Sequence, residues 1–162
     1  MPITIQLAAE EDAALVSAVL SEAAMWLQQS GREMWLPHEV AVDRVQPDVS
    51  AGHYYFARSG QVVTGVVKFQ LLDQVFWPDV PHEDSAFIHR LAVCRAFSGG
   101  GVSRALVDFG ISKARSLNRR YLRLDCAADR PSLREVYEGF GFKHHSNFQV
   151  GPWSVARYEL LL

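Results

Sequence analysis

Three consecutive glycines, Gly99 to Gly101, carry the clearest chemical signal in this chain. They follow the apolar, strand-like run Leu91-Ala92-Val93, and an amphipathic pattern begins directly after them. Glycines let the backbone approach a ligand closely, and the first N–H groups of a helix point outward at the positive end of its dipole. The stretch from Ser98 to Ser103 therefore predicts an anion site, and we expect the phosphate or pyrophosphate of a cofactor there.

The charge distribution supports a small polyanionic ligand. The chain has a net charge of −2, which argues against a general nucleic-acid binder. Between Arg95 and Arg123, however, seven basic residues stand against one acidic residue, Asp108. A local basic field beside a glycine-rich turn suits a polyanion. The alternative is an ordinary solvated helix face, and we expect several of these arginines to be only that.

Length and composition indicate one globular domain spanning residues 1–162. No apolar run is long enough to cross a membrane, and the N-terminus lacks a signal-peptide pattern. Cys94 and Cys126 lie in strand-like contexts, without disulfide or zinc spacing. We therefore expect a cytoplasmic protein that binds no metal, no membrane and no nucleic acid.

Hydrophobic periodicity and turn residues place the elements that must position the glycines. The expected strands are Pro2 to Ala8, Tyr54 to Arg58, Val62 to Leu72, Ser85 to Val93, Tyr121 to Cys126, Phe142 to Val150 and Ser154 to Leu162. The expected helices are Glu10 to Gln29, a short one within Pro37 to Ser50, Val102 to Leu117 and Leu133 to Phe140. Ser59-Gly60 predicts a tight hairpin. This order predicts an α/β sandwich, one mixed sheet with helices on both faces.

Two sequence blocks resemble one known family. Leu91-Ala92-Val93 followed by Gly99-Gly100-Gly101-Val102-Ser103 is similar to the acetyl-CoA-binding motif of the GNAT N-acetyltransferase superfamily, with Ser98, Gly101 and Ser103 at its three defining positions. The second block, Tyr121 to Cys126 and Leu133 to Phe142, resembles the C-terminal half of that family. The resemblance implies a mostly antiparallel central sheet with helices on both faces. It also implies acetyl-CoA contacts from Leu91, Ala92, Val93, Ser98, Gly99, Gly100, Gly101, Val102, Ser103 and Arg104.

The chain departs from the family pattern at three positions. Ser98 stands where the family usually has a cationic or amide side chain, and Ser103 where it has glycine or alanine. Arg130 stands where many relatives have asparagine. The backbone N–H contacts do not depend on side-chain identity, and a serine hydroxyl can add a donor. Arg95 or Arg104 could replace the charge that is missing at Ser98.

The resemblance assigns a proton donor. The family reaction is direct attack of a neutral amine on the acetyl thioester, in which the departing thiolate needs a proton. Tyr137 aligns with the tyrosine that relatives use for this purpose. The alternative is a core aromatic, because Tyr137 shares the apolar face of its helix with Leu133, Val136 and Phe140.

His89 is the candidate base. In an extended strand Phe87, His89, Leu91 and Val93 share one face, which predicts that the imidazole lies about 7 Å from the backbone that holds the acetyl group. The stretch His89 to Phe97 also resembles the arylalkylamine N-acetyltransferase branch, in which a histidine here joins a water-mediated proton path. A hydrogen-bonded structural histidine is the equal alternative. Glu83, with Asp84 and His82, is a rival group that a solvated loop explains better. Glu83 is also a candidate for binding the acceptor.

Three tryptophans lie where the acceptor pockets of the family form. Trp35 and Trp77 stand near prolines in loops, so they are the preferred walls of an aromatic or apolar amine site. Trp26 belongs to the apolar stripe of its helix, so core packing explains it better.

The sequence thus predicts an enzyme that transfers acetyl from acetyl-CoA to the amine of a small molecule or a peptide. The alternative is a non-catalytic module of the same fold that binds CoA or another phosphorylated ligand. An ATPase of the phosphate-loop type is disfavoured because no lysine follows the glycines. Dimers are common in the family, which leaves a homodimer as an option.

Overall fold

The computed structural model of the chain describes residues 2–31 and 35–162. Within these ranges seven strands form one sheet, and four α-helices lie along the chain. The strands are β1 (Ile3–Leu7), β2 (Tyr54–Ser59), β3 (Val62–Gln70), β4 (Ser85–Val93), β5 (Tyr121–Ala127), β6 (Lys143–Val150) and β7 (Trp153–Leu161). Their order in the sheet is β1-β2-β3-β4-β5-β7-β6. The β1–β2, β2–β3, β5–β7 and β6–β7 pairs are antiparallel, whereas β4 and β5 are parallel. The predicted α/β class with a mostly antiparallel sheet is confirmed.

The residues form two compact units that interleave along the chain. The first unit is Met1–Lys68 with Arg90–Leu106, and the second is Phe69–His89 with Val107–Leu162. The chain passes between them inside β3, β4 and α3. That residues 1–162 form a single domain stays a prediction.

The first unit holds the N-terminal helices and strands. Its elements are β1 (Ile3–Leu7), the 3-10 turn Glu10–Asp12, α1 (Ala13–Gln29), the 3-10 turn Pro37–Val40, α2 (Val42–Ser50), β2 (Tyr54–Ser59) and most of β3 (Val62–Gln70). It also holds the end of β4 (Ser85–Val93), the 3-10 turn Arg95–Phe97 and the first turn of α3 (Val102–Ser116). Helix α1 ends where predicted, because Gly31 adopts a left-handed φ of 73°.

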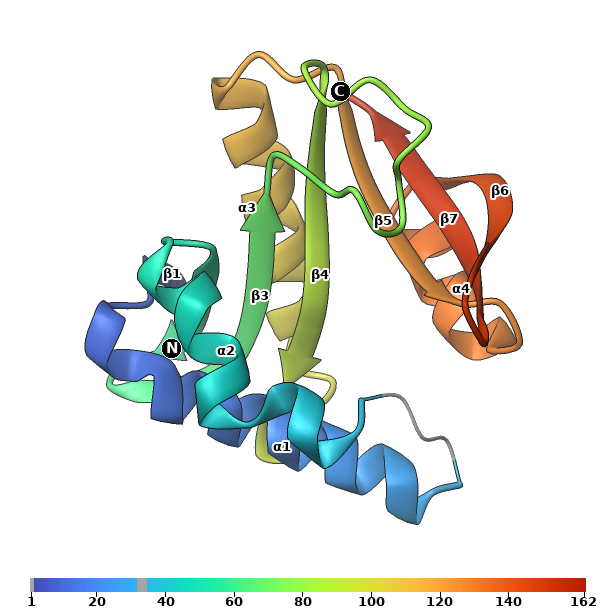
Figure 1. Cartoon of the computed structure of the whole chain (residues 1–162). Coiled ribbons are helices and arrows are strands. Elements are labelled where there is room, and N and C mark those ends of the chain that lie inside the picture. Colours follow the sequence, from blue (N-terminus) through green and yellow to red (C-terminus); the bar gives the residue numbers. More distant parts are fainter. Residues whose placement is uncertain (1, 32–34) are drawn as a thin grey trace. The chain divides into compact units, whose positions relative to one another are not determined.

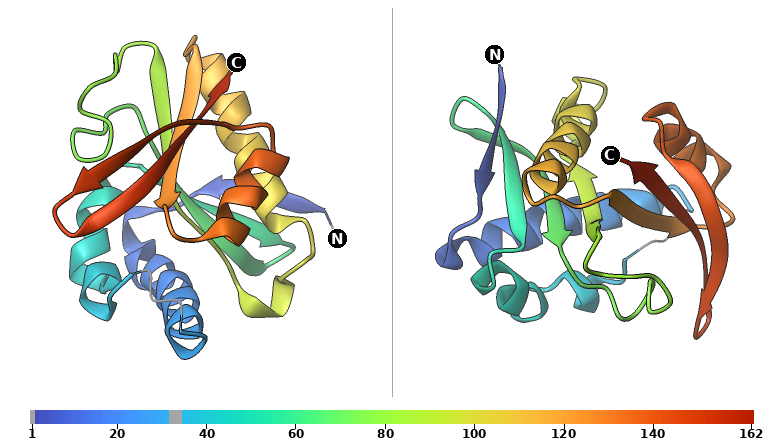
Figure 2. Two further views of the ribbon diagram at one scale, coloured as in Figure 1. Left: turned by 90° about the vertical axis from the view of Figure 1, so that its right-hand side faces the viewer. Right: turned by 90° about the horizontal axis from the view of Figure 1, so that it is seen from above.

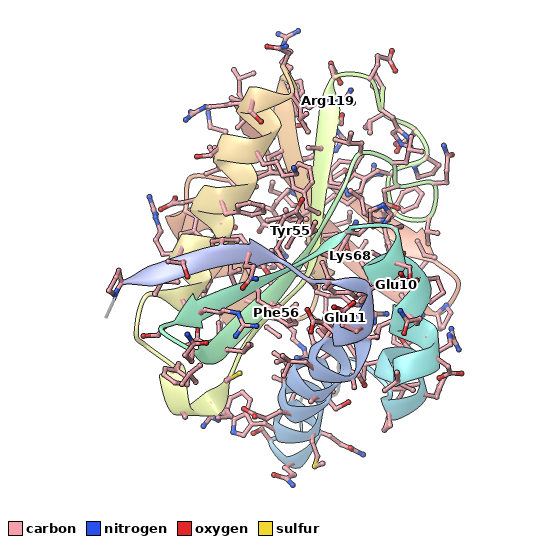
Figure 3. The ribbon with its side chains drawn as sticks, turned by 90° about the vertical axis from the view of Figure 1, so that its left-hand side faces the viewer. Glu10, Glu11, Tyr55, Phe56, Lys68 and Arg119 are labelled. Carbon is pink, nitrogen blue, oxygen red and sulfur yellow. The ribbon has the colours of Figure 1, made fainter. Side chains whose placement is uncertain are left out.

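Helices α1 and α2 contact each other and cover the core of this unit (Figure 1). Leu20 of α1 and Val45 of α2 are buried with Phe56 of β2 and Val66 of β3. At the rim, the Lys68 ammonium of β3 lies 2.9 Å from the Asp48 carboxylate of α2 (Figure 3). The apolar centre therefore holds both helices on this face of the strands, and the Lys68–Asp48 contact adds to the attachment of α2.

The β2–β3 hairpin turns one residue later than the sequence predicts. Ser59 still pairs with Val62, so the turn lies at Gly60-Gln61. Gly60 has a φ of 62°, which is the conformation that the first position of such a two-residue turn requires. The glycine was recognised correctly, but its place in the turn was wrong.

The opposite face of β3 receives the first turn of α3. A Cβ on Gly65 would lie 2.8 Å from the carbonyl oxygen of Ala92 and 2.9 Å from Cγ1 of Val102. Val66, the next residue, belongs to the core beneath α1 and α2. Within the first unit, β3 is therefore covered by helices on both faces, and the α3 side needs a residue without a side chain.

The second unit holds the remaining strands, β5 (Tyr121–Ala127), β6 (Lys143–Val150) and β7 (Trp153–Leu161), with α4 (Pro131–Gly139) and most of α3. Residues Ser85–Phe87 of β4 pair with Tyr121–Arg123 of β5. Strands β6 and β7 form a long antiparallel hairpin (Figure 2). The Tyr158 hydroxyl of β7 accepts a hydrogen bond from Arg134 and donates one to Glu138, which ties α4 to β7.

Both cysteines are free. Burial raises the pKa of the Cys126 thiol to about 11. Cys94 is partly buried and its thiol donates weakly to the Val63 carbonyl at 3.6 Å. Burial, aided by the charge of Glu22, also raises the pKa of Cys94. Both side chains therefore stay protonated at neutral pH.

No helix in the described ranges combines the length and the apolar character needed to cross a membrane.

The close approach at Gly65 predicts a stability defect. Gly65→Ala would press a methyl group against the Ala92 backbone, and we expect a loss of about 1–3 kcal/mol in the free energy of unfolding by urea. Gly139→Ala is the control, because no atom lies within 4 Å of its Cβ position and alanine favours a helix. Equal stability of Gly65→Ala and wild type would show that β3 and α3 are not held at this separation.

Candidate active site

The glycine loop of the first unit is exposed and shaped by two left-handed residues. Gly99 has a φ of 79° and Gly101 a φ of 84°, and no atom lies within 4 Å of a Cβ built on either. Helix α3 begins directly after them, where Ala105 N–H donates to the Gly101 carbonyl at 3.0 Å. The N–H groups of Val102 and Ser103, in the first turn, have no acceptor within the helix. The loop therefore offers open space and outward donors to an anion.

Polar contacts anchor the backbone between β4 and this loop. Cys94 N–H donates to the Thr64 carbonyl of β3 at 2.9 Å, and Arg95 N–H donates to the Glu22 carboxylate of α1 at 2.7 Å. The Arg95 guanidinium lies 3.7 Å from the centre of the Trp26 ring. The loop thus leaves the strand from a fixed position.

The environment of Trp26 corrects its sequence interpretation. Trp26 is only partly buried and stacks on Arg95, so it is not a core residue of α1. It lies in the last turns of the helix, beyond the buried Ala24. Helical periodicity cannot show that the core ends before the helix does.

Strand β4 contains a backbone irregularity that the sequence did not predict. Arg90 has a φ of 52°, a left-handed conformation that is rare for a residue other than glycine. The prediction that the side chains of His89 and Val93 lie on one face of a regular strand is therefore wrong. The distance from the imidazole to the acetyl site that was derived from it is wrong for the same reason. Ala92 is buried in the core of the first unit, and its carbonyl oxygen packs beside Gly65. Leu91 and Val93 are partly buried.

In the second unit, His89 lies between two carboxylates. Its Nε2 is 2.9 Å from Oδ2 of Asp73, and its Nδ1 is 3.8 Å from Oδ2 of Asp125. The side chains of Asp73 and Asp125 are 5% and 11% exposed, so water screens these charges weakly. The structure therefore brings together one predicted residue and two that the sequence analysis missed.

The two carboxylates have opposite pKa shifts. Burial alone would raise the pKa of Asp73, but the contact with His89, its charge and the N–H groups of Phe76 and Val75 lower it overall. Burial raises the pKa of Asp125, and the nearby charge of Asp73 adds to this effect. Asp73 is thus the ionised partner of His89, whereas Asp125 resists ionisation.

The same three residues are a group that could hold a cation. One donor atom from each of Asp73, His89 and Asp125 lies within 4.8 Å of the others. Imidazole and carboxylate donors suit several divalent metals. The expectation of no metal stays a prediction.

Tyr137 lies in α4 of the second unit and is partly buried, with its ring 6.3 Å from that of Phe142 in an edge-on arrangement. Burial raises the pKa of its phenol, and the nearby Cys126 and Asp125 act in the same direction. The hydroxyl therefore remains a proton donor at neutral pH. Its predicted role as an acid stays a prediction.

Trp77 lies in the loop after β3, as predicted, but it is a core residue of the second unit. It is fully buried, with Phe87 and His145 within ring-contact distance, and the Arg157 guanidinium lies 4.7 Å from its ring. Arg157 in turn binds both oxygens of Asp79, at 2.7 and 3.0 Å. Residues of β4, β6 and β7 therefore surround the indole. A role for Trp77 in acceptor binding stays a prediction.

The remaining acceptor candidates have different surroundings. Trp35 is half-buried against the core of the first unit. Glu83 is exposed, and its backbone carbonyl accepts a hydrogen bond from Arg119. The neighbouring side chains make contacts within the same loop. A ring nitrogen of His82 lies 2.9 Å from the Trp77 carbonyl oxygen, and the Asp84 carboxylate accepts a hydrogen bond from the Ser85 hydroxyl.

The chain is similar to proteins of one family over most of its length. Residues 20–142 match the sequence model of the acetyltransferase (GNAT) family. The uncharacterized N-acetyltransferase YesJ of Bacillus subtilis strain 168 is 28% identical over 139 residues, which cover 82% of this chain and 77% of YesJ.

Solved structures share the fold. A GNAT-family acetyltransferase from Listeria monocytogenes superimposes with a TM-score of 0.80 at 21% identity, covering 98% of this chain and 95% of its own. YncA of Salmonella typhimurium, a putative acetyltransferase solved with acetyl-CoA, gives a TM-score of 0.73 at 18% identity, covering 99% of this chain and 94% of its own.

The lowered pKa of Asp73 predicts a pH-dependent stability. The unfolded state binds more protons at this position, so the contribution is present above about pH 4 and is lost as the pH falls through the folded-state pKa. We expect Asp73→Asn to lower the free energy of unfolding by about 1.5–3 kcal/mol at pH 7, and the difference from wild type to shrink below pH 4. Urea titrations at several pH values measure it.

Asp129→Asn is the control, because Asp129 is exposed in the turn before α4. A difference between Asp73→Asn and wild type that stays constant from pH 7 to pH 3 would contradict the assigned ionisation.

Proposed function

The chain belongs to the acetyltransferase (GNAT) family, and on that premise we propose that it transfers the acetyl group of acetyl-CoA to the amine of a small molecule or a peptide. The observation that carries the proposal is the exposed loop from Ser98 to Gly101, which leads from β4 into the N-terminus of α3. YesJ is named an N-acetyltransferase, and YncA was solved with acetyl-CoA.

The first unit would hold the CoA. Gly99 and Gly101 leave room for the pyrophosphate, and the N–H groups at the start of α3 donate to its oxygens. The backbone N–H groups of Leu91 and Val93 would bind the pantetheine arm and the acetyl oxygen. The hydroxyls of Ser98 and Ser103 would add side-chain donors to the phosphate oxygens.

Acetyl-CoA supplies the acetyl group as a thioester. A bond forms between the amine nitrogen and the acetyl carbon, the carbon–sulfur bond breaks, and the amine loses a proton. We assign that proton to Nδ1 of His89, since Nε2 already meets Asp73 whereas Nδ1 is too far from Asp125 for a hydrogen bond. Asp73 would stabilise the imidazolium. The Tyr137 hydroxyl would give its proton to the departing sulfur.

Thiol release tests the proposal. The protein is incubated with acetyl-CoA and a panel of amines, and free CoA is measured with time. Amine-dependent release supports transfer. Binding of CoA without release for any amine would support the non-catalytic alternative.

A matched pair of variants tests the glycine loop. Asparagine and aspartate both tolerate the left-handed conformation of Gly101, so they differ in charge and not in backbone strain. CoA should raise the melting temperature of wild type, since it binds the folded state. Gly101→Asp should abolish the rise by repelling the phosphates, while Gly101→Asn retains part of it. Equal shifts for both variants would place the phosphates elsewhere.

His89→Gln tests the base. Glutamine keeps a hydrogen-bonding side chain but does not titrate, so the acid limb of the pH–rate profile should flatten and turnover should fall about 10²–10⁴-fold, while CoA still binds. His144→Gln, an exposed histidine of β6, is the control. An unaltered profile would favour the Glu83–Asp84 pair or an amine deprotonated by bulk water.

A further inference from the structure

Arg90 has a backbone conformation that its residue type does not favour. In the described parts of the chain, Arg90 and Asn118 are the residues other than glycine with positive φ. Asn118 follows the end of α3, where asparagine is well tolerated. The left-handed backbone conformation costs about 1–3 kcal/mol for a residue such as arginine, and such strain is often found at functional sites. A functional contact of the Arg90 side chain would explain why this backbone strain is retained.

Neutral groups hold the Arg90 side chain. Its Nη1 donates to the backbone carbonyl of Glu39 at 3.1 Å, and its guanidinium lies 6.0 Å from the centre of the Trp35 ring. It also interacts with the buried Tyr54 hydroxyl, whose pKa burial raises to about 12 against the opposing charge of Arg90. These contacts orient the guanidinium without neutralising it.

The charge of Arg90 has no partner of opposite sign in residues 2–31 and 35–162. The buried arginines of the second unit differ, because Arg123 pairs with Glu159 and Arg157 pairs with Asp79. A half-buried guanidinium that keeps donors available is a fitting receptor for a carboxylate, which it can bind through two parallel N–H···O bonds.

We propose that Arg90 binds the carboxylate of the acceptor, so that the substrate is a small amine that also carries a carboxylate, such as a free amino acid. The proposal rests on the proposed function, since Leu91, the next residue along β4, is assigned to the acetyl-CoA site. The half-buried Trp35 ring would contact the apolar part of the acceptor. A peptide N-terminus, whose carboxylate lies far from its amine, would not be preferred.

Paired amines with and without a carboxylate test the proposal, with kcat/KM expressed per concentration of neutral amine, because the carboxylate also raises the pKa of the neighbouring amine. Thiol release is measured for phenylalanine against phenylalaninamide and for leucine against leucinamide. We expect kcat/KM for the carboxylate member to exceed that for the amide by about 10- to 100-fold. Arg90→Gln should remove this preference without lowering the rate for the amides, and Arg90→Lys should restore part of it.

Arg44→Gln is the control, because Arg44 is an exposed arginine of α2 in the same unit. It should leave the preference intact. Equal kcat/KM values for the acids and the amides in wild type would overturn the proposal while leaving acetyl transfer in place. A preference for the acids that survives in Arg90→Gln would overturn it in the same way. The wild-type comparison and Arg90→Lys decide the question if Arg90→Gln does not fold. Absence of release for every amine would overturn acetyl transfer and this inference together.

Discussion

The absence of a side chain at Gly65 is the constraint on which the candidate cofactor site depends. It lets the first turn of α3 lie against β3 beside the carbonyl of Ala92. The connection from β4 to α3 must then reverse within a few residues, and it does so with left-handed glycines at 99 and 101. The packing contact at Gly65 and the left-handed glycines of the loop therefore act together to place the donors of the helix start at the end of β4.

The second unit concentrates charge where water is scarce. One imidazole lies between two carboxylates whose pKa values are displaced in opposite directions, which is how a site separates an ionised group from one that retains its proton. Beside them, Trp77 is enclosed by the guanidinium groups of Arg123 and Arg157. Each arginine is itself neutralised by a carboxylate, so the enclosure is stable without a ligand.

The local features of the fold were predictable, whereas the long-range contacts of the site were not. Strand β4 begins and ends at Ser85 and Val93 as predicted, because its apolar run is bounded by turn residues. The glycine loop is a local signal as well. Asp73 and Asp125 were missed because they stand 52 positions apart and meet only through tertiary packing. Asp125 and Arg123 are the charged residues of β5, and an acidic residue in a strand that is apolar at most other positions was the available hint for Asp125. Nothing near Arg90 in the sequence marks its left-handed backbone.

The protonated state of both cysteines has a practical consequence for enzymology. The chromogenic disulfide reagents that detect free CoA react with thiolates. Neither Cys94 nor Cys126 has an appreciable thiolate population at neutral pH. The protein should contribute a low, slow background to a continuous colorimetric assay. Blocking or replacing the cysteines is then unnecessary, and the native chain can be used for kinetics directly.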